Sequence, residues 1–193
     1  VKGTSDDREV YTVPCASNQL KYAAAMAAVS RALKEKMPEL SSKALAASES
    51  AYRYFQSHSN TWVQTPYNNY PSGWQEDMRT AVAIELYLAT GKKKYKNIAL
   101  RGKEALETVY IGARRYMEVS INWYALPHAI RAVDQFPELK EHVEAGAKRW
   151  LKVFGSFEKK SIFGIDDEYE DTDWGIIGQN LGIGIIHFMI EHY

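Results

Sequence analysis

Residues 74–91 read WQEDMRTAVAIELYLATG, and this stretch predicts one complete helix. The helix is expected to run from Trp74 to Thr90, with Gly91 as the residue that follows its end. Glycine is favoured directly after a helix because it adopts a left-handed backbone conformation without a steric penalty. The residues on either side of this stretch continue the same pattern of helices and connections.

Further helices are expected before and after residues 74–90. Apolar residues recur at helical spacing from Ser17 to about Lys36, and Pro38 is expected to stop that helix. Ser41 or Ser42 is expected to cap a second helix. Strand patterns are absent, so the fold class is predicted to be all-α, with about seven helices in antiparallel pairs. The helices expected after the first one run over residues 42–56, 74–90, 93–109, 120–134, 137–154 and 175–193.

Composition limits the classes of partner. The 193 residues carry 24 Lys and Arg against 24 Asp and Glu, so no net field favours nucleic acid or an acidic membrane as a partner. The sequence shows no apolar run of membrane-spanning length and no signal peptide. The single cysteine, Cys15, excludes a disulfide within the chain. Because the chain starts without Met and stops inside a helical pattern, it is expected to be an excised segment of a longer protein.

Three stretches, in order along the chain, resemble glycoside hydrolase family 9, the family of many cellulases. Residues 8–34 are similar to the family's Arg-x-Val-Tyr, small-residue turn and alanine-rich helix. Residues 77–95 are similar to its Asp-Glu-x-x-Trp-Ala-Ala and Leu-Tyr-x-Ala-Thr-Gly helix. Residues 163–180 contain Phe-Gly-Ile, Trp-Gly and an Asn, which resemble its Phe-Gly-Val-Pro and Trp-Gly-Ser-Asn segment. Together the three stretches span residues 8–180, which is most of the chain.

The resemblance implies an (α/α)6 barrel, of which residues 1–193 would form one partial domain. It also implies hydrolysis of a β-1,4-linked glucan with inversion, by two carboxylates roughly 6.5–9.5 Å apart with a water between them. The family's Asp-x-x-Asp base motif and its late Glu acid do not occur in these 193 residues. No catalytic residue is therefore assigned here. The chain is expected to be inactive alone, and to supply scaffold and part of the sugar-binding cleft.

The implied partners are an oligo- or polysaccharide of the β-glucan type and the remaining barrel helices, from the same parent or another chain. The implied location is secreted, periplasmic or on the cell surface. Aromatic rings stack on the apolar faces of sugars, and the family places such rings before the helix at residue 74 and at the Trp-Gly segment. For His128 a packed histidine is the alternative to a cleft contact. The candidate substrate-binding residues are Tyr67, Tyr70, Trp74, Trp123, His128 and Trp174.

A structural calcium is the one metal that the resemblance suggests, and no cofactor is expected to be required. Ser72, Glu76 and Asp77 resemble the family's Ser-Gly-x-x-Asp-Glu calcium segment with the two acids exchanged. Carboxylate, hydroxyl and carbonyl oxygens are the ligands that Ca²⁺ takes. The alternative is that Ser72 caps the helix and the two acids lie near its positive end. The acidic residues between 166 and 173 are interpreted as a solvated loop.

Two other functions stay open at this point. One is a non-catalytic helical module that binds carbohydrate or protein through its aromatic loop. The other is an (α/α)-barrel enzyme of a different glycan-active family.

Overall fold

The computed structural model describes residues 16–58, 74–107, 124–154, 184–186 and 188–193. All regular secondary structure within these ranges is helical, which confirms the all-α prediction. None of the described helices is both long and apolar enough to span a membrane. The elements are α1 (Ala16–Leu33), α2 (Pro38–Ser57), α3 (Trp74–Thr90), α4 (Lys93–Arg101), α5 (Ala125–Ile130) and α6 (Lys140–Phe154), with 3-10 helices at Lys103–Glu107 and Pro137–Leu139.

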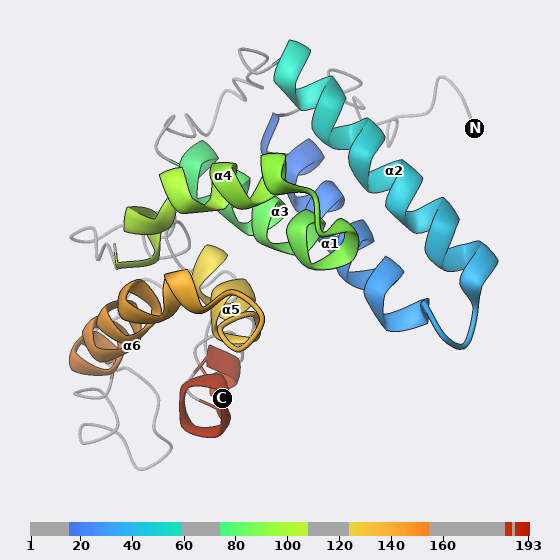
Figure 1. Ribbon diagram of the computed structural model, residues 1–193. Coiled ribbons are helices and arrows are strands. Elements are labelled where there is room, and N and C mark those ends of the chain that lie inside the picture. Colours follow the sequence, from blue (N-terminus) through green and yellow to red (C-terminus); the bar gives the residue numbers. More distant parts are fainter. Residues whose placement is uncertain (1–15, 59–73, 108–123, 155–183, 187) are drawn as a thin grey trace, which may run out of the picture.

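Helices α1 and α2 form an antiparallel pair (Figure 1). Alanines of both helices lie in the hydrophobic cluster that they share, and the hydroxyl of Ser48 on α2 donates to the carbonyl oxygen of Ala23 on α1 at 2.6 Å. Likewise the hydroxyl of Ser41 donates to the carbonyl of Ser30 at 2.7 Å. A buried hydroxyl is stable only with such a partner. These bonds therefore let the two helices approach closely without an unsatisfied polar group.

The expected start of the second helix was wrong. Helix α2 begins at Pro38, so Ser41 lies inside the helix and contacts α1 instead of capping. Proline is favoured at the first helical position because that position needs no N–H donor and the ring fixes the required φ. Pro38 therefore starts α2, whereas α1 has already ended at Leu33.

Helix α3 lies at the centre of the described fold and contributes to two hydrophobic clusters. Met78 and Val82 pack with α1, α2 and α4, whereas Ala81 and Ile84 pack with α5, α6 and the C-terminal residues. Figure 1 shows α3 and α4 between the α1–α2 pair and the group formed by α5 and α6. Tyr87 packs against both clusters. The two clusters are therefore joined through α3.

The predicted end of α3 is confirmed, since Gly91 has a φ of +66°. The helix expected over 93–109 is shorter than predicted. Helix α4 ends at Arg101, Gly102 is its C-cap, and a 3-10 helix follows. Glycine in a helix interior costs about 1 kcal/mol relative to alanine, which favours a break at this position.

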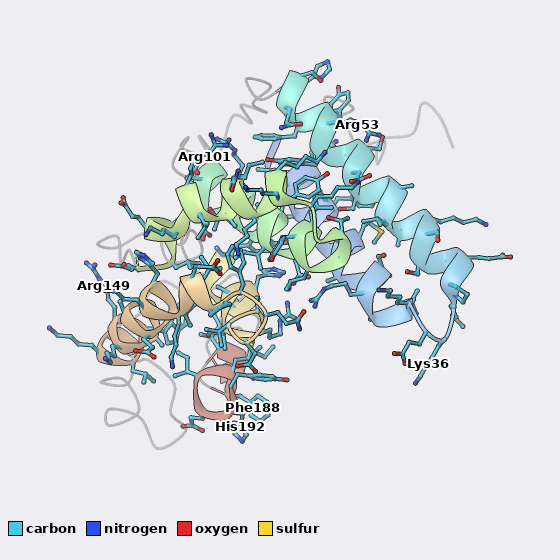
Figure 2. The ribbon with its side chains drawn as sticks, in the orientation of Figure 1. Lys36, Arg53, Arg101, Arg149, Phe188 and His192 are labelled. Atoms are coloured by element: carbon cyan, nitrogen blue, oxygen red, sulfur yellow. The ribbon has the colours of Figure 1, made fainter. Side chains whose placement is uncertain are left out.

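Large apolar side chains remain exposed on the C-terminal helical residues. Phe188 is 55% exposed and stacks on His192, with the ring centroids 4.0 Å apart. Figure 2 shows both rings at the outer edge of the molecule. Ile185 is exposed on the same segment, and Leu151 is exposed on α6. Large apolar side chains are thus exposed both on α6 and on the C-terminal helical residues.

Candidate functional site

A buried carboxylate on α3, Glu85, is the centre of the candidate site. Its side chain is 0% exposed. Two helical turns separate it from Met78, so the helical period places both residues on the face of α3 that packs into the core. An isolated charge in such a place would be strongly destabilising, and Glu85 therefore needs partners.

Three basic side chains provide these partners, and together with Glu85 they define the Glu85 cluster. Arg31 of α1 donates from Nε at 3.0 Å and from Nη2 at 2.7 Å to Oε2 of Glu85. The other carboxylate oxygen, Oε1, lies 2.7 Å from Nδ1 of His128 on α5 and 3.2 Å from Nη2 of Arg131, the residue after α5. Charge-assisted contacts of this kind are among the strongest hydrogen bonds in proteins.

The electrostatic balance of the cluster favours the ionised carboxylate. Burial acts to raise the pKa of Glu85, but the hydrogen bond from His128 and the positive charges of Arg31 and Arg131 outweigh it, and the pKa is lowered. Glu85 is therefore a fixed negative charge at neutral pH. The cluster thus ties α1, α3 and α5 together at one point.

A second buried carboxylate, Asp77, holds the beginning of α5. Its side chain oxygens accept the backbone N–H groups of Tyr124 and Ala125, each at 3.0 Å. Burial raises the pKa of Asp77 to about 7, although these two N–H groups act in the opposite direction. Eight residues of helix, or about 12 Å, separate Asp77 from Glu85. Asp77 thus fixes the backbone where α5 begins, and Glu85 holds the side chain of His128 on α5.

A sequence profile of glycosyl hydrolase family 9 matches residues 2–179. The chain belongs to this family. The search of curated proteins found no match. The resemblance drawn from the three sequence stretches is thereby confirmed, and with it the fold class, because the helices described above form part of the family's (α/α)6 barrel. The coarse function is that of a glycoside hydrolase of the cellulase type, which acts on carbohydrate.

In this family 9 chain, His128 is the predicted substrate-binding residue that the structure describes in full. Its ring contacts Glu85, lies 5.3 Å from the ring of Tyr124, and keeps 14% of the side chain exposed. Trp74 is the first residue of α3, but its side chain lies outside the described part of the chain. The remaining candidates also lie outside it and stay predictions: Tyr67, Tyr70, Trp123 and Trp174.

The two acids of the predicted calcium segment point to different partners. The carboxylate of Glu76 is 48% exposed and pairs with Arg79 at 3.1 Å, whereas Asp77 faces α5. Ser72 lies outside the described residues. Within the described ranges, no group of three or more His, Cys, Asp or Glu residues gathers to hold a metal ion. The calcium site stays a prediction, and an ion there would have to share Asp77 with two N–H groups.

The grouping of Arg31, Glu85 and Arg131 around one site was not predicted from the sequence. One signal was available for Glu85, since it stands between Ile84 and Leu86 at a position where the helical period predicts burial. A charged residue at such a position indicates a specific partner. The identity of that partner depends on how α1 and α5 pack.

Proposed function

We propose that this chain forms scaffold and part of the sugar-binding wall of a hydrolase that cleaves β-1,4-linked glucan with inversion. The observation that supports this most is the family match over residues 2–179. In this proposal residues 1–193 belong to one partial barrel domain, and the protein acts outside the cytoplasm, where its polymeric substrate lies. Detection of the protein in the culture medium of the source organism would test its location.

The catalytic carboxylates are proposed to come from residues outside these 193. Neither the family's Asp-x-x-Asp motif nor its late Glu occurs in the sequence. The two most buried acids described here are unsuited to the role, because Glu85 is fully buried among three basic groups and Asp77 is 1% exposed and bound to backbone N–H groups. An inverting pair needs a water between its carboxylates and access to the glycosidic oxygen.

The remaining barrel helices are proposed to cover the apolar face near the C-terminal helical residues, from the same polypeptide or from another chain. Leu151, Ile185 and Phe188 are exposed there. Burial of such apolar side chains under a second surface is favourable because it removes them from water. Helices packed on this face would continue the barrel beyond α6.

Sugar binding by the chain itself is tested by NMR titration of the ¹⁵N-labelled protein. We expect cellohexaose to shift signals of residues around α5, while maltohexaose, its α-linked counterpart, leaves them unchanged. Incubation with cellohexaose should release no shorter sugar, because the sequence lacks the family's two catalytic motifs. Equal responses to the two sugars would contradict a β-glucan site.

The stereochemical part of the proposal needs a protein that also contains the two carboxylates. Proton NMR of its earliest product from a β-1,4-glucan should show the α anomer. A β anomer formed first would refute inversion. Binding without any cleavage by that longer protein would instead favour a non-catalytic carbohydrate-binding module, the alternative that the absent motifs support.

A further inference from the structure

The two oxygens of Glu85 have different partners. Both contacts from Arg31 reach Oε2, at 2.7 and 3.0 Å. Oε1 is left to His128 and Arg131. Since Glu85 is 0% exposed, its carboxylate cannot turn toward solvent without breaking the contacts on both sides. Oε1 is therefore a fixed acceptor directed at Nδ1 of His128.

A fixed acceptor determines which ring nitrogen carries the hydrogen. An ionised carboxylate can only accept hydrogen bonds, and a neutral imidazole has one N–H donor and one acceptor nitrogen. The 2.7 Å contact with Oε1 therefore assigns the hydrogen to Nδ1 of His128. Arg131 lies 3.1 Å from the same Nδ1, but a guanidinium only donates, so its hydrogen bond goes to Oε1 of Glu85.

This assignment leaves Nε2 of His128 as an acceptor. No hydrogen bond to Nε2 is formed by any group in the described ranges, and 14% of the side chain is exposed. Arg131 is 40% exposed and its guanidinium, with Nη2 3.1 Å from Nδ1, adds further N–H donors near the ring, while the Tyr124 and His128 ring centroids are 5.3 Å apart. An acceptor next to a donor suits two neighbouring hydroxyls of a pyranose, since each hydroxyl can both donate and accept.

We propose that Glu85 is a positioning residue that holds His128 as the Nδ1–H tautomer, so that Nε2 accepts a hydrogen bond from a hydroxyl of the bound β-glucan. The ligand in this statement rests on the proposed function, whereas the tautomer rests on the Glu85 cluster alone. A carboxylate that orients a histidine ring and fixes its tautomer is a recurrent arrangement in functional sites. Here it would add a specific polar contact to the sugar-binding wall.

The tautomer is measured directly by NMR of the imidazole nitrogens in protein labelled with ¹⁵N-histidine. The His128 signals are assigned by their loss in a His128→Gln variant. In the wild-type chain at neutral pH, we expect a pyrrole-type signal for Nδ1 and a pyridine-type signal for Nε2. A protonated Nε2, alone or together with Nδ1, overturns the proposal.

The ligand contact is tested on the same sample by adding cellohexaose. We expect the pyridine-type Nε2 signal of His128 to move as a hydroxyl hydrogen-bonds to it. Shifts elsewhere in the protein with Nε2 unchanged would overturn this inference and leave the proposed function standing. The absence of any shift with cellohexaose would overturn both.

The role of Glu85 is tested by Glu85→Gln. Its amide oxygen can still accept from Arg31, which turns the amide NH₂ toward His128, so we expect the tautomer to reverse to Nε2–H. Affinity for cellohexaose should then fall about tenfold, the effect of one lost hydrogen bond. Glu144→Gln makes the same chemical change at an exposed position on α6. It should alter neither the His128 tautomer nor the affinity for cellohexaose. An unchanged tautomer in a folded Glu85→Gln protein overturns the proposal, and if that variant does not fold, the wild-type measurements decide.

Discussion

Replacing Asp77 with asparagine is expected to remove a pH dependence from the stability of this chain. The Asp77 carboxyl is buried, and its pKa in the folded state is about 7, against the ordinary value of 3.8. The folded state therefore holds the proton more tightly than the unfolded state does. It follows that the stabilisation by the protonated group is fully present below about pH 4 and is lost as the pH rises toward 7.

The size of the effect follows from the two pKa values. A difference of about three pH units corresponds to about 4 kcal/mol in total, of which about 2.5 kcal/mol is lost between about pH 5 and pH 8. The pKa of Glu85 is lowered from 4.5, so its titration falls below this range. Asparagine keeps one acceptor oxygen but leaves one of the N–H groups of Tyr124 and Ala125 without a partner, at a cost of about 1–3 kcal/mol.

The assay is urea denaturation followed by far-UV circular dichroism, at several pH values between 5 and 8. Groups common to both proteins cancel in a difference, so the informative quantity is the wild-type free energy of unfolding minus that of Asp77→Asn. This difference should favour the wild type at pH 5 and shrink by about 2.5 kcal/mol by pH 8. Glu76→Gln, at the neighbouring exposed carboxylate, should follow the wild-type profile. Parallel curves for wild type and Asp77→Asn would refute the reasoning.

Three further outcomes are expected. In Gly146→Ala the new Cβ would lie 2.1 Å from the carbonyl oxygen of Leu106, so stability should fall by about 2–3 kcal/mol, and a change in urea midpoint too small to resolve would show that the backbone adjusts. Phe136→Ala removes a fully buried ring that packs edge-on against Tyr87 at 4.9 Å, which should cost about 3–5 kcal/mol, whereas a loss below about 1 kcal/mol would indicate collapse of the cavity. If calcium binds through Asp77, adding the ion should raise the thermal midpoint, and no response to calcium or EDTA would remove that site.

A helix boundary could be predicted where the residue that marks it has a single structural role. Residues 74–90 form α3 as expected, because Gly91 has a clear role after a helix. Pro38 shows the limit of such signals. A proline can end one helix or occupy the first turn of the next, and only the packing of α2 on α1, with Ser41 bonded to Ser30, selects the second.

The candidate site was predictable only in part, because its contacts join residues far apart in the sequence. The position of Glu85 on α3 indicates burial, but its partners lie 54 residues earlier at Arg31 and 43 residues later at His128. These pairings depend on the packing of α1 and α5 against α3, which no local pattern encodes. The sequence suggests a cleft contact for His128 but does not indicate the carboxylate that holds its ring.

The central position of α3 has a consequence for how the length of this protein can vary among relatives. Each residue of an α-helix advances by about 100°, so inserting or deleting one residue between Asp77 and Glu85 would rotate one carboxylate away from α5 while the other stayed in place. The same rotation would turn the residues on one side of the change, Val82 or Ile84 among them, away from the cluster that each contacts. Changes in chain length should therefore accumulate in the connections between helices. They should be absent from α3, because both the number and the identity of its residues are constrained.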